Sequence, residues 1–177
     1  MSESESSKRH RAEAPKTVKF GIFVCSTSRY NQLKKGEKVK DESGDLMEHL
    51  IKNSGHTVSF RKLIPDDKAL IEESVKYALE SDVDAVVFCG GTGIASSDVT
   101  IETVSPFLEK VLPGFGEIFR LLSYEAIGSA AVLSRAIAGV AKSKVFFCIP
   151  GSMDAVRLCF EKLILGEVAH IVKHARE

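Results

Sequence analysis

The sequence predicts an α/β fold, a three-layer domain with a mostly parallel sheet, helices on both faces and one antiparallel hairpin. Two observations support this prediction. Short apolar runs at residues 20–25, 85–89 and 145–149 are typical of strands that are covered on both faces. Segments with helical periodicity alternate with these runs, which favours parallel strands joined by right-handed helical connections.

Size and composition favour one domain without a strong pull toward nucleic acid or membrane. The chain has 177 residues and a formal net charge of zero. No apolar run approaches the ~18 residues of a membrane helix. Residues 1–16 are polar and lack the apolar segment of a secretory signal, so we expect a disordered tail followed by one domain at 17–177. The four cysteines form no C-x-x-C pair, which disfavours a zinc site and favours a reduced, cytoplasmic protein.

The first half of the chain predicts strands at residues 17–26 and 56–63. The lysine-rich segment between them, residues 27–40, is interpreted as a long solvated loop, although its charges could also gather an anionic substrate. Asp41 or Ser43 is expected to cap the following helix, and Gly55 to end it. After Pro65, we expect Asp66 or Asp67 to cap a helix that carries one apolar stripe, namely Ile71, Val75, Ala78 and Leu79.

Residues 84–100 form the stretch around which the domain is organised. The strand at residues 85–89 runs into Gly90-Gly91-Thr92-Gly93, and a helical pattern follows Asp98. Such a turn lies at the carboxyl end of its strand and favours an anion, most often phosphate. The turn lacks the lysine of a P-loop, and Ser96 stands where the dinucleotide fingerprint needs Gly or Ala. Asp98 suits either a divalent cation between protein and phosphates or a simple helix cap.

The second half predicts a loop at residues 112–117, an apolar helix at 118–126 and a hairpin that pairs 136–141 with 145–149. Pro150-Gly151-Ser152 makes a second glycine turn, placed where it can face the first, and Ser152 is expected to cap a helix at 153–165. The last helix, 166–175, carries His170 and His174 four residues apart. These two could bind a metal, but no third ligand is evident, so surface histidines are the favoured interpretation.

The motifs, taken in order, resemble the molybdopterin adenylyltransferase family of molybdenum cofactor biosynthesis, the MoaB/MogA-like proteins. The resemblance covers nearly everything after residue 17 and rests on one set of motifs: Asp41-x-Ser43-Gly44, Ile64-Pro65-Asp66, Gly90-Gly91-Thr92-Gly93 with Asp98-Val99-Thr100, residues 113–117, Ser134-Arg135 and Pro150-Gly151. The sequence departs from the family pattern at Ser97, where a basic residue is common, and at Ser152, where Asn or Gln is common.

The resemblance implies a compact α/β homo-oligomer, a trimer or a hexamer of two trimers, that transfers AMP from ATP to the terminal phosphate of molybdopterin. It implies that Asp66 and Asp98 are catalytic and hold Mg²⁺. The implied nucleotide and pterin site is made of Gly90, Gly91, Thr92, Gly93, Ser134, Arg135, Pro150, Gly151 and Ser152. A metal-insertion protein of the same pathway is a possible partner. The alternatives left open are a non-catalytic molybdopterin carrier of the same fold and a nucleotide pyrophosphatase.

Overall fold

A six-stranded sheet in the order β2-β1-β3-β6-β5-β4 forms the centre of the computed structural model, which describes residues 14–177. The expected tail at residues 1–16 therefore lies almost entirely outside the described residues. The strands β1, β2, β3 and β6 run parallel, whereas β4 and β5 are antiparallel to their neighbours. Their bounds are β1 Lys19–Cys25, β2 Thr57–Ile64, β3 Ala85–Cys89, β4 Lys110–Val111, β5 Ile137–Ala141 and β6 Lys144–Ile149.

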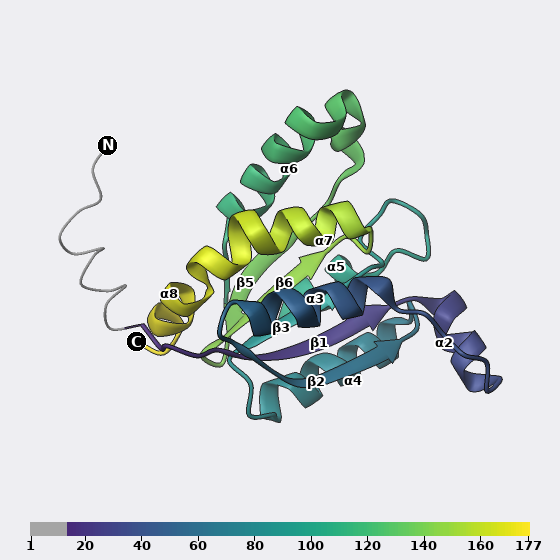
Figure 1. Ribbon diagram of the computed structural model, residues 1–177, viewed down its shortest axis with the longest axis horizontal. Coiled ribbons are helices and arrows are strands. Elements are labelled where there is room, and N and C mark those ends of the chain that lie inside the picture. The colour runs from purple at the N-terminus through teal and green to yellow at the C-terminus, as the bar shows by residue number, and fades with distance from the viewer. Residues whose placement is uncertain (1–13) are drawn as a thin grey trace.

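Helices cover both faces of this sheet, as the sequence predicts (Figure 1). Alternate residues of the central strands divide the core, because successive side chains of a strand point to opposite faces. Ile22 and Val87 pack with α3 (Glu42–Asn53), α7 (Met153–Cys159) and α8 (Leu165–Ala175). Phe23 and Phe88 pack with α4 (Lys68–Glu80) and α5 (Thr100–Val104) on the other face. The three-layer prediction is confirmed.

The expected hairpin is also present. β5 pairs antiparallel with β6 from Ile137↔Cys148 to Ala141↔Lys144. Lys142 and Ser143 turn the chain with positive φ angles of 45° and 61°, the pattern of a two-residue turn that matches strand twist. This hairpin carries Ser134 and Arg135 to the edge of the sheet where β3 ends.

Two segments that we expected to be loops are helical. Residues 27–34 form helix α2 (Thr27–Lys34), which buries none of its side chains and so lacks the apolar periodicity that predicts a helix. Residues 113–117 form the first turn of α6 (Pro113–Ile127), because Pro113 occupies an N-terminal position where its missing N–H costs nothing. A β-carbon on Gly116 would lie 2.6 Å from the carbonyl oxygen of Ala136, so this glycine permits close packing.

The C-terminal helices are continuous, where the sequence predicted a break near residue 165. A π-helical turn at Phe160–Ile164 joins α7 to α8, and it buries Phe160 and Ile164 against the sheet. In contrast, the helix expected after Asp98 is short, since α5 gives way to a 3₁₀ turn at Ser105–Phe107. A second, longer 3₁₀ segment, Gly128–Leu133, follows α6. No helix in the described part of the chain is long and apolar enough to cross a bilayer.

Candidate functional site

Two glycine turns face each other at the carboxyl ends of β3 and β6. Gly90 and Gly91 have positive φ angles of 108° and 61°, which residues with a β-carbon rarely adopt. A β-carbon on Gly90 would lie 2.3 Å from the carbonyl oxygen of Cys25, and one on Gly151 would lie 3.4 Å from the α-carbon of Gly90. The close packing of β1, β3 and β6 ends therefore requires glycine at residue 90.

A pocket of about 330 Å³ opens between these turns. It brings together nine of the eleven site residues that the sequence predicted, and Leu133 completes its wall. The pocket is lined by Gly90, Gly91, Thr92, Gly93, Asp98, Leu133, Ser134, Arg135, Pro150 and Gly151. Asp66 and Ser152 lie outside this lining. The roles of these residues toward a ligand stay a prediction.

Arg135 braces the first glycine turn. Its Nε donates to the carbonyl oxygen of Thr92 across 2.9 Å, and its Nη2 donates to that of Gly93 across 2.7 Å. Nη1 pairs with Glu102 of α5 at 2.5 Å, and this hydrogen bond lowers the pKa of the Glu102 carboxyl. The guanidinium thus fixes the shape of the turn, and its charge is already balanced before any ligand binds.

Asp98 does not cap α5, so the capping alternative is wrong in that form. The N-cap position is Val99, without a side-chain hydrogen bond. The carboxylate of Asp98 folds back instead, and Oδ2 accepts from the backbone N–H of Ala95 across 2.9 Å. A β-carbon on Gly93 would lie 2.6 Å from that same Oδ2. The absence of a side chain at Gly93 therefore leaves room for the Asp98 carboxylate at the pocket wall.

Asp66 does not cap its own helix either, because Asp67 accepts from the backbone N–H of Leu70 and fills that position. Instead, Oδ2 of Asp66 accepts from both the N–H and the hydroxyl of Thr27, each at 2.9 Å, at the start of α2. Its other oxygen, Oδ1, is buried and has no hydrogen-bond partner, and the same holds for Oγ1 of Thr100.

These two unpaired oxygens lie on the same side of the first glycine turn. A β-carbon on Gly91 would lie 2.4 Å from Oγ1 of Thr100 and 2.7 Å from Oδ1 of Asp66. Buried polar atoms without partners are rare in folded proteins, and each one calls for a ligand or a water. Hard oxygen atoms of this kind suit Mg²⁺. The residues present therefore fit the divalent cation that the resemblance implies.

Two further serines from the sequence analysis, Ser152 and Ser97, lie outside the pocket lining. Ser152 caps α7, since its hydroxyl accepts from the N–H of Ala155 at 3.3 Å, as predicted. Ser97 lies in an exposed turn before Asp98.

All four cysteines are buried and free, and burial raises the pKa of Cys25 and of Cys89 to about 12, which argues against a nucleophilic thiol.

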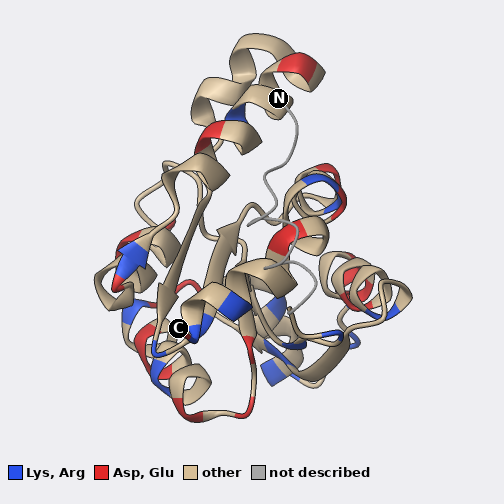
Figure 2. Cartoon of the chain, turned by 90° about the vertical axis from the view of Figure 1, so that its left-hand side faces the viewer, with Lys and Arg blue, Asp and Glu red and all other residues tan. Residues whose placement is uncertain are grey.

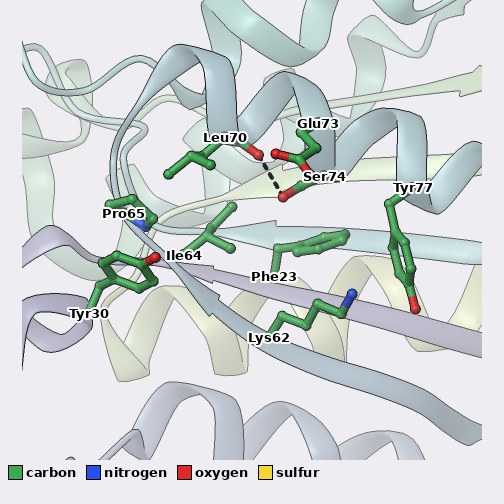
Figure 3. Close-up of a pocket in the computed structure, with 9 residues that line it drawn as sticks. All are labelled: Phe23, Tyr30, Lys62, Ile64, Pro65, Leu70, Glu73, Ser74 and Tyr77. Atoms are coloured by element: carbon green, nitrogen blue, oxygen red, sulfur yellow. Dashed lines mark hydrogen bonds between the residues drawn. The ribbon is translucent and has the colours of Figure 1, made fainter. Parts of the chain in front are cut away.

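A second pocket, of about 200 Å³, lies between β2 and α4 (Figure 3). Pro65, just before Asp66, contributes to its wall. The amino group of Lys62 lies 3.3 Å from the centre of the Tyr77 ring, so its charge faces an aromatic surface. This pocket has no glycine turn, and the features suited to phosphate are in the other pocket.

Sequence reasoning missed Thr27, Thr100 and Glu102. Thr100 was included in the motif that ends Asp98-Val99-Thr100, but no role was given to its hydroxyl. Thr27 and Asp66 are 39 positions apart, and only the parallel pairing of β1 with β2 brings their loops together. The signal for Glu102 is its position on the helix that follows the glycine turn, opposite an arginine.

Comparison with known proteins agrees with this architecture. Residues 21–170 match a family described as "Probable molybdopterin binding domain". The chain belongs to this family. It is 47% identical over 164 residues to molybdenum cofactor biosynthesis protein B of Bacillus anthracis, a match that covers 92% of this chain and 93% of that protein.

A sequence relative and a solved structure from Pyrococcus furiosus are also similar to this chain. A molybdopterin adenylyltransferase is 44% identical over 172 residues, covering 95% of this chain and 97% of the relative. The crystal structure of the tungsten cofactor synthesizing protein MoaB superposes with a TM-score of 0.82 at 42% identity, covering 93% of this chain and all of that one. The resemblance that the motifs indicated is confirmed for this member of the molybdopterin-binding family.

Proposed function

We propose that this chain is a molybdopterin adenylyltransferase. An oxygen of the terminal phosphate of molybdopterin attacks the α-phosphorus of ATP, the bond to the bridging oxygen breaks, and pyrophosphate leaves. The observation that carries the proposal is the pair of facing glycine turns, with Asp98 on the pocket wall and an unpaired carboxylate oxygen of Asp66 behind Gly91. The relatives named as adenylyltransferases support the same activity.

Phosphoryl transfer of this kind depends on positioning and charge neutralisation more than on covalent chemistry by the protein. The backbone N–H groups of residues 91–93 can hold phosphate oxygens without adding another titratable group. Arg135 keeps those N–H groups in place by holding the carbonyl oxygens of the same turn. Ser134 also lines the pocket, where its hydroxyl can donate to the pterin phosphate.

Asp66, Asp98 and Thr100 would hold Mg²⁺ in this proposal. The ion supplies neutralisation of the triphosphate charge when it is bound. Thr27 orients Asp66, because its two hydrogen bonds to Oδ2 leave Oδ1 turned toward Gly91 and Thr100. Ala95 does the same for Asp98 through its backbone N–H.

Incubation with ATP, Mg²⁺ and molybdopterin tests this function, with mass spectrometry to detect adenylated pterin and a coupled assay for pyrophosphate. We expect both products in equal amounts, and neither when EDTA removes the metal. Pterin binding without product would favour the carrier alternative. Pyrophosphate release without pterin would favour the pyrophosphatase alternative.

Self-association is a second part of the proposal. Helix α6 projects from the body of the domain (Figure 1), and Figure 2 shows only scattered charges on it. Its exposed apolar side chains are spaced three residues apart at Ile118, Leu121, Tyr124 and Ile127, and we call them the α6 apolar face. Val132 and Leu133 continue this surface to the pocket, with exposures of 80% and 58%.

Apolar surface of this extent marks an interaction site rather than a solvated one. The occupant we propose is a second copy of this chain, in a trimer or a hexamer of two trimers as the family resemblance implies. Because Leu133 belongs both to this surface and to the pocket, association would also shield one wall of the site from water. Assembly with a metal-insertion protein and a cytoplasmic location remain predictions from the resemblance and the composition.

A further inference from the structure

The motif Asp41-x-Ser43-Gly44 lies in a charged cluster to which the proposed transfer gives no role. Asp41 is the N-cap of α3, and its Oδ1 accepts from the N–H of Gly44 across 3.1 Å. The same oxygen accepts from Nη1 of Arg29 across 2.7 Å. Oδ2 accepts from Nε of Arg61 across 3.0 Å. Each carboxylate oxygen is thus bound by one arginine, and we call Arg29, Asp41 and Arg61 the arginine clasp.

Little of the arginine clasp is exposed to solvent. The side chain of Asp41 is 11% exposed, and both arginine side chains are 24% exposed. Arg61 belongs to β2, and its Nη1 pairs with Asp45 and Glu48 of α3 at 2.7 and 3.3 Å. Arg61 therefore fixes Asp41 between the sheet and α3, and the carboxylate is a rigid anchor for Arg29.

Helix α2 depends on this anchor because it places none of its side chains in the core. It extends from the end of the sheet, away from the layered helices (Figure 1). Only Arg29 and Tyr30 are even half-buried along it, and Tyr30 lines the small pocket beside Pro65. Among the described residues, the side chains of α2 make polar contacts with the body of the domain at two places. These contacts are Arg29 with α3 and Thr27 with Asp66.

The two contacts lie in the first turn of the helix, only two residues apart. The N–H and the hydroxyl of Thr27 each donate to Oδ2 of Asp66 across 2.9 Å. The other oxygen, Oδ1, is the buried and unpaired one behind Gly91. A shift of this turn would therefore move both donors and redirect Oδ1. A displacement of about 1 Å at a positioned group can cost up to about 10²-fold in rate.

The arginine clasp also lies beside the strand end that carries the first glycine turn. Burial raises the pKa of the Cys89 thiol to about 12, while the nearby charge of Asp41 acts in the same direction and that of Arg29 in the opposite one. Cys89 is the last residue of β3 and directly precedes Gly90. The clasp is therefore close enough to serve the pocket without lining it.

We propose that Arg29 is a positioning residue, which fixes the first turn of α2 and thereby aims the free oxygen of Asp66 at the metal of the transfer reaction. This inference rests on the proposed function. Its link from the clasp to Asp66 concerns only the free chain, however, and that link can be measured without any substrate.

Amide hydrogen exchange of the full chain tests this link. Arg29→Met keeps an apolar stem and removes the contact with Asp41. We expect exchange to quicken by about tenfold or more across α2 and at the N–H of Asp66, which donates to the Thr27 hydroxyl. The matched control is Lys34→Met on the same helix, where the ammonium group lies over the Tyr30 ring. This control should exchange like the unaltered chain.

A double-mutant cycle tests whether Arg29 acts through Thr27. Arg29→Met should lower kcat by about tenfold and raise the Mg²⁺ concentration needed for half the maximal rate, with KM for molybdopterin unchanged. Thr27→Val should do the same, and the double variant should be no slower than the slower single variant. Arg29→Lys keeps one donor toward Asp41 and should recover part of the rate.

These measurements separate failure of the inference from failure of the proposed function. If the unaltered chain makes no adenylated pterin, the proposed function fails, whereas exchange at Asp66 still shows whether the clasp holds this residue. Unchanged exchange at Asp66 in Arg29→Met would overturn the inference in either case. Additive rate losses in the double variant would also overturn it, because Arg29 would then act by another route. Arg29→Lys repeats the exchange comparison with a smaller change if Arg29→Met does not fold.

Discussion

Thr27 and Asp66 are joined by three hydrogen bonds, each 2.9 Å long. The hydroxyl of Thr27 donates to Oδ2 of Asp66 and accepts from the Asp66 N–H, while the Thr27 N–H donates to the same Oδ2. This reciprocal arrangement ties the start of α2 to the loop after β2. It also saturates one carboxylate oxygen and leaves the other, which is buried, without a protein partner. Such support holds the carboxylate of Asp66 in a fixed orientation, as its proposed role toward a metal requires.

The buried hydroxyl of Thr100 provides a test of ligand binding that is separate from folding. Replacing a buried, unpaired hydroxyl with a methyl group of similar shape is nearly neutral or stabilising. We therefore expect Thr100→Val to melt at the same temperature as the unaltered chain or higher. If Oγ1 serves the metal and its phosphates, the variant should lose most of the thermal stabilisation that Mg-ATP confers.

Thr103→Val is the matched control for this substitution. The hydroxyl of Thr103 donates to the Val99 carbonyl oxygen within the same short helix, at 2.7 Å, and does not reach the glycine turn. Differential scanning fluorimetry with and without Mg-ATP distinguishes the two. A normal Mg-ATP shift in Thr100→Val would remove this hydroxyl from the site.

Arg135→Lys should disrupt the first glycine turn although it keeps the positive charge. The guanidinium reaches two carbonyl oxygens and Glu102 with three of its nitrogens, and a single ammonium group cannot reproduce that fork. We expect adenylyl transfer to fall by about 10²-fold, as is typical when fixed electrostatic support is lost. Arg157→Lys, whose side chain only pairs with Glu161 on the surface, is the control and should keep full activity.

The Arg135–Glu102 pair also predicts a pH dependence of stability. The hydrogen bond from Arg135 lowers the pKa of Glu102 below its ordinary value of 4.5. A carboxyl group whose pKa is lowered on folding stabilises the fold above its unfolded pKa, and this contribution disappears as the pH falls through its folded value. The effect is small, because both side chains are partly exposed.

Glu102→Gln should therefore lower the melting temperature slightly at pH 7, and the difference should shrink as the pH falls through the lowered pKa of Glu102 and this carboxyl group becomes neutral. Thermal melts of both proteins between pH 3 and 7 measure the difference. A gap between the two proteins that stays constant across this range would show that packing, and not the ion pair, is responsible.

The parts of the site that residue patterns could predict depend only on residues that are close together along the chain. Gly90, Gly91 and Pro150 follow apolar strands directly, and parallel strands bring their carboxyl ends to one edge. The pairing of Asp66 with Thr27 could not be predicted this way, since neither residue identity nor spacing shows which loop an aspartate faces. The residue pattern indicated only that Asp66 or Asp67 caps the next helix, and Asp67 occupies that position. The metal-binding role of Asp66 was implied by the resemblance alone.

The errors in the fold have physical causes as well. Helix α2 is short and polar and buries no residue, so no apolar periodicity predicts it, and the Asp66 carboxylate accepts from the N–H of its first residue. The glycines at 114 and 116 indicated a loop. Gly116 instead allows α6 to pack closely against the backbone at Ala136. This requirement arises from the tertiary structure and cannot be seen in the local sequence.

Disruption of the α6 apolar face should dissociate the oligomer without unfolding the subunit. Leu121 and Tyr124 are 58% and 61% exposed, so a charge at either position costs little in an isolated chain. Leu121→Glu and Tyr124→Glu should each shift the sedimentation profile toward the monomer. The control is Leu33→Glu on α2, where the leucine is 51% exposed but stands apart from that face. A monomer mass for the unaltered chain at micromolar concentration would contradict self-association directly.

The decisive prediction concerns Asp66 and Asp98, and Asp67 supplies its control. Asn caps helices about as well as Asp, so Asp67→Asn should be silent in both stability and activity. Asp66→Asn can keep an oxygen toward Thr27, and Asp98→Asn can keep one toward the Ala95 N–H, so both variants should fold and assemble normally. Each loses a negative charge beside the proposed metal, and we expect transfer to fall by about 10²–10³-fold.

Binding of molybdopterin should survive in both variants, because in the proposed complex backbone N–H groups and hydroxyls hold its phosphate. Asp98→Asn should bind the anionic pterin at least as tightly as the unaltered chain, since a repelling carboxylate on the pocket wall has been removed. Parallel measurements of transfer rate, melting temperature and pterin affinity in the three variants separate the possibilities. If both site variants turn over about as fast as Asp67→Asn, these two carboxylates serve only to hold Thr27 and Ala95. The case for a metal-dependent enzyme would then fail.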